Sequence, residues 1–292
     1  MTDSFLKYIQ LERRYSPQTV ISYETDLRQF QEFLTREFDS TLPQDANHSL
    51  VRSWIVSLVE AKMDATSINR KIACLRSYYK FLMKNQIIKK SPMYKIMVLK
   101  TKKKLPHFVQ QNEMIQLLDE PDTVNSFEST RDRLILELLY GTGMRRAELL
   151  NLKDSSLNLT DGTVKVLGKR NKERVIPFTS KLVSLLKGYM AIRNKEVEKK
   201  ESGFLLVTKH GDALSPAMVG KIVKSALKHV NVEKKSPHVL RHSYATHLLN
   251  EGAEINAVKD LLGHTSLAAT QVYTHNSIEK LKKVFEKAHP KA

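Results

Sequence analysis

Six side chains in the second half of the chain have the chemistry needed to handle a phosphate ester, and each stands near an expected turn or helix end. They are Arg145 in TGMRRAEL, Lys169 in LGKRNKERVIP, His238 and Arg241 in HVLRH, His264 in LLGHTS and Tyr273 in TQVYTH. Arginine offers paired donors to phosphate oxygens, lysine and histidine carry charge or protons, and a tyrosine hydroxyl can act as a nucleophile. Each residue alone also has an ordinary structural explanation, because most helical histidines and most tyrosines have no catalytic role.

The local sequence around His238 predicts that it shares a helix face with Arg241. Ser236 can cap a helix whose first residue is Pro237, so His238 lies in the first turn and Arg241 follows three residues later. A helix N-terminus that carries a histidine and an arginine suits a phosphate.

Gly263 is expected to end one helix, which places His264 at a corner of the chain. Tyr273 is nine residues further on, and in one continuous helix it would lie on the opposite side from His264. The break at Gly263 is therefore needed if the two side chains are to meet.

Lys169 belongs to the polar turn GKRNKE, which separates two short runs rich in β-branched residues, 163–167 and 174–178. This pattern predicts a β-hairpin. Arg170, Lys172 and Arg174 are cations at or beside the same turn, and the spacing does not choose among the four.

Residues 1–97 have helical periodicity and are expected to form an all-α bundle. Ser16 is a plausible N-cap with Pro17 as the first helical residue, and Thr66 is the expected cap of a later helix. Shorter helices are expected around Phe5 and Ile9 and over 50–58, and the residues 98–106, VLKTKKKLP, form the predicted linker.

Residues 107–292 are expected to form a larger, mostly helical domain with a small antiparallel β-sheet, so the fold class is mainly α. The predicted helices lie near 113–118, 131–140, 182–197, 215–229, 236–250, 255–262 and 267–273. The residues 278–285, IEKLKKVF, have the spacing of a further amphipathic C-terminal helix.

Composition narrows the class of partner. The 292 residues include 48 Lys and Arg against 31 Asp and Glu, a formal net charge of +17, which favours a polyanionic partner such as nucleic acid. Cys74 is the one cysteine, so an intramolecular disulfide and a thiolate metal cage are excluded. The first twenty residues do not resemble a signal peptide and no stretch is apolar enough to span a membrane, so we expect a cytoplasmic protein without a membrane partner.

The excess of positive charge is concentrated between residues 65 and 112, where there is no Asp or Glu. This acid-free stretch predicts a surface that faces DNA phosphates, although a solvated lysine-rich face and a flexible linker would have the same composition. The candidate DNA contacts within it are Arg70, Lys71, Arg76, Lys80, Lys100, Lys102, Lys103 and Lys104.

The six residues, in this order and in these motifs, resemble the tyrosine recombinases, or phage integrase family, and most closely its Xer-like members. The resemblance extends over nearly the whole chain, since YSPQTVISYETDLRQFQEFL is similar to the opening of the family's helical core-binding domain. It implies a core-binding, SAM-like domain over 1–97, a catalytic domain over 107–292, and double-stranded DNA at a specific recombination site as the substrate.

The resemblance also implies a mechanism. Tyr273 attacks a phosphodiester to give a 3′-phosphotyrosyl bond, Arg145 and Arg241 stabilise the charge on the phosphate oxygens, and His238 assists at the tyrosine. Lys169 protonates the leaving 5′-oxygen, and His264 holds the phosphate. No metal or other cofactor is expected.

The assembly that the resemblance implies is a homo-tetramer, or a hetero-tetramer with a second Xer protein, on two DNA sites. A septal DNA translocase is a further expected partner, in the context of chromosome dimer resolution. The amphipathic residues 278–285 are the expected link between protomers, and the two domains are expected to grip DNA from different sides.

Alternatives remain at this stage. A non-catalytic DNA-binding protein would have the same charge, a type IB topoisomerase-like enzyme would have the same chemistry, and an integrase or invertase of a mobile element would have the same active site. A metal-dependent nuclease with His238 and His242 as ligands is disfavoured, because the carboxylate of an HExxH motif is missing. Arg146 and Arg170 depart from the residues common in the family, and Arg170 lies in the turn that carries Lys169.

Overall fold

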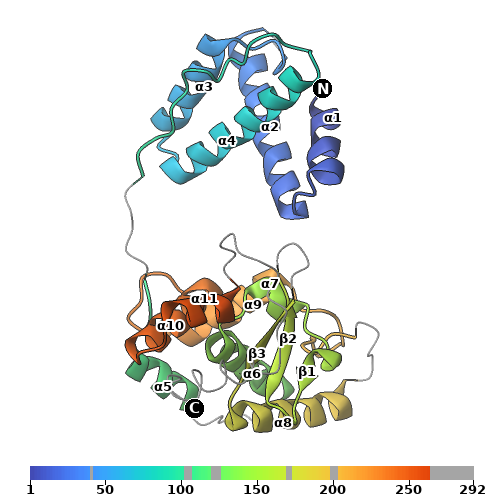
Figure 1. Ribbon diagram of the computed structural model, residues 1–292, viewed down its shortest axis with the longest axis vertical. Helices are drawn as coiled ribbons and strands as arrows, with labels where there is room; N and C mark the ends of the chain where they lie inside the picture. The colour runs from blue at the N-terminus through green and yellow to red at the C-terminus, as the bar shows by residue number, and fades with distance from the viewer. Residues whose placement is uncertain (40–41, 102–106, 120–125, 169–172, 198–202, 264–292) are drawn as a thin grey trace. The chain divides into compact units, whose positions relative to one another are not determined.

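The computed structural model describes residues 1–39, 42–101, 107–119, 126–168, 173–197 and 203–263 (Figure 1). The chain divides into two compact units, Met1–Lys104 and Leu105–Ala292. The boundary falls within the stretch 98–106. None of the helices in the described ranges is long and apolar enough to cross a membrane.

The first unit is a helical bundle, as the sequence predicts. Its elements are α1 (Thr2–Lys7), a π-helical turn (Tyr8–Glu12), α2 (Pro17–Glu37), α3 (His48–Glu60) and α4 (Ala65–Lys84). α2 begins where expected, because the Ser16 hydroxyl accepts a hydrogen bond from the Thr19 N–H. Helices α2 and α4 pack on each other and on α1 and α3, and they enclose a core that includes Phe30, Trp54 and Tyr79.

The predicted cap of α4 is wrong by two residues. The N-cap is Asp64, whose carboxylate accepts hydrogen bonds from the N–H groups of Thr66 and Ser67 at 3.0 and 3.3 Å. A carboxylate at this position satisfies two of the free N–H groups and also interacts favourably with the positive end of the helix dipole. Thr66 therefore lies inside the first turn.

The second unit is mostly helical with one small sheet (Figure 1). Its helices are α5 (Gln111–Asp119), α6 (Phe127–Thr142), α7 (Arg146–Leu150), α8 (Ser180–Glu196), α9 (Pro216–Ala226), α10 (Pro237–Asn250) and α11 (Ile255–Leu262), with 3-10 turns at Asp154–Ser156 and Leu227–His229. Strands β1 (Leu157–Asn158), β2 (Thr163–Leu167) and β3 (Glu173–Pro177) form an antiparallel sheet in the order β1-β2-β3. The predicted hairpin is therefore present, with Val164 opposite Ile176.

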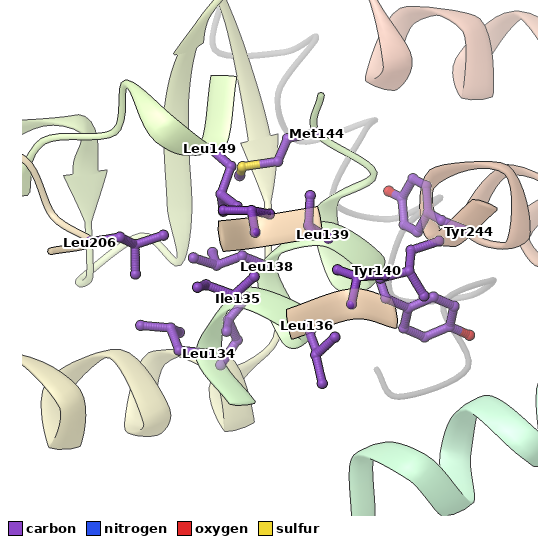
Figure 2. Packing of buried hydrophobic residues seen from close by; sticks show 14 of the residues in the cluster. Leu134, Ile135, Leu136, Leu138, Leu139, Tyr140, Met144, Leu149, Leu206 and Tyr244 are labelled. Carbon is purple, nitrogen blue, oxygen red and sulfur yellow. The ribbon is translucent and has the colours of Figure 1, made fainter. Parts of the chain in front are cut away.

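α6 is the central helix of this unit, since it packs against α5, α7, α8, α9 and α10. Figure 2 shows its side chains Leu134, Ile135, Leu138 and Leu139 in the buried cluster. The helix begins earlier than the predicted 131–140 because Ser126 forms a capping box with a serine three residues later. It continues through Gly141 and ends at Gly143, which has the left-handed conformation (φ 59°).

Three short elements were not predicted, namely α7, the 3-10 turn at Asp154–Ser156 and β1. Segments of two to five residues are too short to show a periodic pattern. The predicted helix over 267–273 and the amphipathic residues 278–285 lie outside the described residues.

Candidate active site

Arg145 is held at the start of α7 by its neighbours in the chain and by one carboxylate. Met144 and Leu149 are fully buried in the cluster around α6 (Figure 2), so the backbone on both sides of Arg145 is anchored. The backbone N–H of Arg145 donates to Glu148 Oε2 at 2.7 Å, and Nη1 donates to Glu148 Oε1 at 2.8 Å. The side chain retains 30% exposure. Glu148 therefore fixes one side of the Arg145 guanidinium, and the other side is accessible to solvent.

Arg241 lies on α10 and is almost completely buried. Its Nη1 donates to the carbonyl of Gly143 and its Nη2 to the carbonyl of Leu262, each at 2.6 Å. Both partners are neutral, so they orient the guanidinium without cancelling its charge. Burial, followed by repulsion from Arg145 and Arg174, lowers the pKa of Arg241 to about 10, which leaves it charged at neutral pH.

The two arginines come from distant parts of the chain and meet at the end of α11. That helix ends at Gly263 in the left-handed conformation (φ 63°). The Leu262 carbonyl accepts from Arg241, and the carbonyl of Gly263 accepts from Arg145 Nη2 at 3.0 Å. The two guanidinium groups thus donate hydrogen bonds to adjacent backbone carbonyls and lie close together. Such a pair is suited to bind a single anion such as a phosphodiester.

Glu148 is a central residue of this site that sequence reasoning missed. It is buried, and burial alone would raise its pKa. The hydrogen bonds and charge of Arg174, and then the hydrogen bonds of Arg145, outweigh burial and lower the pKa of Glu148 to about 2. The spacing of three residues between Arg145 and Glu148, which is that of a helix N-cap and its N3 partner, was the available signal.

His238 lies in the first turn of α10, three residues before Arg241, as predicted, and it is exposed. Pro237 is the first helical residue, and Ser236 is the N-cap without a side-chain hydrogen bond. The pKa of His242 is lowered by burial and then by the neighbouring His238. Within the described ranges, no three His, Cys, Asp or Glu side chains gather in a way that could hold a metal ion.

Three of the six predicted site residues, Lys169, His264 and Tyr273, lie outside the described residues, and so does Arg170. Of the two departures from the family pattern, Arg146 is described. It is exposed on α7 and donates to the carbonyl of Pro216 at 3.3 Å, which points its guanidinium toward the start of α9.

The candidate DNA contacts of the first unit separate into two groups. Arg70, Arg76, Lys80 and Lys100 are exposed, whereas the Lys71 side chain is 4% exposed and its ammonium donates to Asp26 at 2.8 Å and to Gln29. Lys71 therefore joins α4 to α2 inside the bundle. Residues 102–104, which include the remaining three candidates, lie outside the described residues.

The four exposed cations of the first unit differ in how strongly hydrogen bonds and ion pairs restrain their side chains. Arg70 also pairs with Asp26 while its side chain keeps 43% exposure, and Arg76 donates to the Ile96 carbonyl. Lys80 lies one turn beyond Arg76 on α4, so the two share a face of that helix.

Two family models match the chain. The Phage integrase family model matches residues 107–280, and the model of the Phage integrase N-terminal SAM-like domain matches residues 2–86.

Similar proteins agree with these matches. The chain is 37% identical over 300 residues to tyrosine recombinase XerC of Pelotomaculum thermopropionicum, covering 99% of this chain and 98% of that protein. It is 35% identical over 292 residues to tyrosine recombinase XerD of Staphylococcus aureus, with the same shares covered.

Solved structures with the same fold include a XerH site-specific recombinase bound to palindromic difH substrate, with a TM-score of 0.71 and 24% identity over 97% of this chain and 83% of that one. The Tn1549 transposon integrase in complex with transposon right end DNA gives a TM-score of 0.72 and 18% identity over 97% of this chain and 98% of that one. At these identities the likeness concerns the fold.

Proposed function

We propose a residue-level mechanism and a cellular role for this chain, which belongs to the phage integrase family and is a site-specific tyrosine recombinase, a DNA strand-transfer enzyme. The observation that carries the mechanism is the pair of guanidinium groups on adjacent carbonyls at the end of α11. A DNA phosphodiester bound there would have two fixed, charged donors for its non-bridging oxygens.

In the proposed reaction the hydroxyl of Tyr273 attacks the phosphorus. A Tyr–O–P bond forms, the bond to the 5′-oxygen breaks, and the energy of the broken ester is kept for rejoining. The phenol has a pKa near 10 and must lose its proton during attack, and we assign assistance in this step to His238. Lys169 gives a proton to the leaving 5′-oxygen, and His264 binds the phosphate.

Arg145 and Arg241 supply the positive charge that metal ions provide in many other phosphoryl transfers. Both are positioned before substrate arrives, since their carbonyl and carboxylate partners are part of the fold. Preorganised donors of this kind need little rearrangement in the transition state. We therefore propose that cleavage is independent of a metal or other cofactor.

The proposed substrate is double-stranded DNA with a specific recombination site. The exposed cations of the acid-free stretch, Arg70, Arg76, Lys80 and Lys100, are the proposed phosphate contacts of the first unit, together with Lys102, Lys103 and Lys104. We leave Lys71 out of this set because its ammonium is used inside the bundle.

The proposed cellular role is Xer-type chromosome dimer resolution in the cytoplasm, which serves chromosome partition before cell division. Its support is the similarity to XerC and XerD proteins over 99% of the chain. One tyrosine cuts one strand and recombination exchanges four, so we propose a tetramer on two sites, made of this chain alone or with a second Xer protein. A septal DNA translocase would bring the two sites together.

The test of the mechanism is covalent capture. Full-length protein selects a binding site from a random-sequence duplex library, and the selected duplex is then nicked so that the cut strand cannot be rejoined. We expect a protein–DNA adduct that survives denaturation in wild type and is lost in Tyr273→Phe, which keeps its DNA affinity. An adduct formed by Tyr273→Phe at the normal rate would reject Tyr273 as the nucleophile, and no adduct in wild type would favour a non-catalytic binding protein.

A further inference from the structure

We infer that Arg174 is a positioning residue for the recombination reaction, which orients Arg145 through Glu148 and fixes the end of α11. The inference rests on the role proposed above for Arg145. Arg174 lies on β3, at the end of the hairpin whose turn carries Lys169, and its side chain is 5% exposed.

Every nitrogen of the Arg174 guanidinium has a partner within the protein. Nη1 and Nη2 donate to the two carboxylate oxygens of Glu148 at 2.7 and 2.8 Å, and Nε donates to the carbonyl of Leu261 at 2.9 Å. The bidentate geometry fixes the plane of the carboxylate as well as its position. Arg174 therefore joins three elements, namely β3, α7 and α11.

Three consecutive backbone carbonyls at the end of α11 each accept a hydrogen bond from an arginine, and each arginine comes from a different element. The carbonyl of Leu261 accepts from Arg174, that of Leu262 from Arg241, and that of Gly263 from Arg145. These carbonyls form the negative end of the helix dipole, which favours cations. Arg174 is thus the third member of the cluster that includes both proposed phosphate-binding arginines.

Glu148 connects Arg174 to Arg145. Its carboxylate accepts two hydrogen bonds from the Arg174 side chain and two from Arg145, one from the backbone N–H and one from Nη1. Without Arg174, a buried carboxylate would lose two of these four partners. It would then turn toward solvent or become protonated, and either change removes the fixed support of the Arg145 guanidinium.

Gly263 gives a second indication that the Arg174 side chain is part of this end of α11. A Cβ atom built on Gly263 would lie 3.1 Å from Cδ and 3.2 Å from Nη1 of Arg174. The guanidinium and its stem therefore fill the space directly beside the left-handed turn. Since Gly263 immediately precedes His264 in the chain, Arg174 supports the point from which the next segment starts.

Arg174 differs from Arg145 in what it can contact. Arg145 keeps 30% side-chain exposure, whereas Arg174 is buried with its donors directed at protein acceptors. A residue in that position acts on the substrate through its neighbours. A single ammonium cannot span two carboxylate oxygens and a carbonyl, so charge alone is insufficient and Arg174→Lys should not restore function.

The experiment compares full-length variants on the nicked duplex selected by the wild-type protein. We expect Arg174→Gln and Arg174→Lys to lower the rate of adduct formation at saturating DNA by about 100-fold, the loss typical of a misplaced catalytic group, while Kd changes by less than about threefold. The matched control is Arg193→Gln. Arg193 is another buried arginine of the same unit, bidentate to Asp154 at 2.7 Å, and its loss should leave the rate per folded molecule unchanged.

A double-mutant cycle separates action through Glu148 from direct contact with DNA. If Arg174 works through Glu148, the variant carrying both Arg174→Gln and Glu148→Gln is no slower than the slower single variant. If the rate losses of the two single variants instead multiply in the double variant, the inference is overturned. A normal rate in Arg174→Gln or full activity in Arg174→Lys would overturn it as well.

A DNA-free measurement keeps this inference distinct from the proposed function. The Nε–H resonance of Arg145 in ¹⁵N-arginine-labelled protein, assigned by its loss in Arg145→Lys, should shift in Arg174→Gln and stay in place in Arg193→Gln. If wild type forms no adduct while this resonance shifts, the proposed function fails and the positioning contact stands. If wild type forms the adduct and the resonance does not move, the inference on Arg174 fails alone.

Discussion

Replacing Gly143 with alanine should destabilise the second unit, and the structure allows the size of the effect to be worked out. Gly143 has φ 59°, and the left-handed conformation costs an L-residue about 1–2 kcal/mol. A Cβ atom there would overlap Cδ1 of Tyr244 and lie 2.8 Å from its Cε1 and 3.0 Å from Cδ2 of Leu262. Tyr244 is fully buried within the cluster shown in Figure 2, so it cannot move aside without repacking.

Overpacking of this kind costs about 1–3 kcal/mol, so Gly143→Ala should lower the free energy of unfolding by about 2–5 kcal/mol in total. The control is Gly188→Ala in α8, where an added Cβ meets nothing within 4 Å. Since alanine is the better helix former, the control should stabilise the same unit by about 0.5–1 kcal/mol.

Denaturant titration followed by circular dichroism measures both variants. The single tryptophan, Trp54, belongs to the first unit, so its fluorescence identifies the transition of that unit. A loss below about 1 kcal/mol in Gly143→Ala would refute the argument, because even the backbone cost alone reaches that value. Because the Gly143 carbonyl also holds Arg241, the rate of adduct formation per folded molecule should fall in Gly143→Ala and stay normal in Gly188→Ala.

Five further outcomes are expected. The pKa of Glu148 is about 2 in the folded chain against 4.5 ordinarily, so its carboxylate stabilises the fold above pH 4.5. The free energy of unfolding should therefore fall by about 3 kcal/mol as the pH falls from 5 toward 2. Acid titration of Glu148→Gln should lack this loss. Asp26→Asn should cost about 3–5 kcal/mol by leaving the buried charge of Lys71 without its carboxylate partner, whereas Glu32→Gln, in an exposed pair, should cost under about 1 kcal/mol in the same unfolding assay. Neutralising residues 102–104 should reduce the slope of log K against log[salt] by up to about 0.9 per lost phosphate contact, and an unchanged slope would make them ordinary linker residues. Deleting residues 278–292 should leave single-site binding intact in gel-shift assays and abolish cooperative binding. Adding a metal chelator should leave the rate of adduct formation unchanged.

The elements were predictable where periodicity and end signals agree. α11 has the predicted bounds and ends at Gly263 as expected, and α2 begins at the predicted cap. The expected cap of α4, Thr66, is wrong even though local sequence contains the signal, because Asp is preferred over Thr at the N-cap and Asp64 lies two residues earlier.

Lys71 shows why a charge pattern alone misassigns a side chain. The residue lies at helical spacing from Ile68 and Leu75, so periodicity places it on the buried face. The acid-free stretch nevertheless predicts that Lys71 faces DNA, because its partner Asp26 is distant in sequence and on another helix. Pairing across the bundle is a property of packing, and a sequence pattern contains no information about it.

The same reasoning explains why the third arginine of the cluster, Arg174, could not be identified from the sequence. Arg145 and Arg241 stand in recognisable motifs, but their partners are backbone carbonyls, which every residue has. The sequence indicates only that Arg174 is one of four cations at or beside a turn. Its role depends on β3 lying against the end of α11, a contact that only the folded chain establishes.

α10 is held at both ends, which makes it a rigid support for the site. At one end Arg241 bonds to the carbonyls of Gly143 and Leu262. At the other, His247 Nε2 is 2.9 Å from the Val109 carbonyl and Nδ1 is 2.9 Å from the Tyr140 hydroxyl, while the Val109 N–H donates to Ser243. Burial lowers the pKa of His247, so the ring is neutral at pH 7 and one nitrogen donates while the other accepts. α10 is thus bonded to α6, to the end of α11 and to the segment that follows the linker, so it cannot shift alone. A change at any of these three attachments would therefore alter the position of Arg241 and of His238, which lies three residues before it.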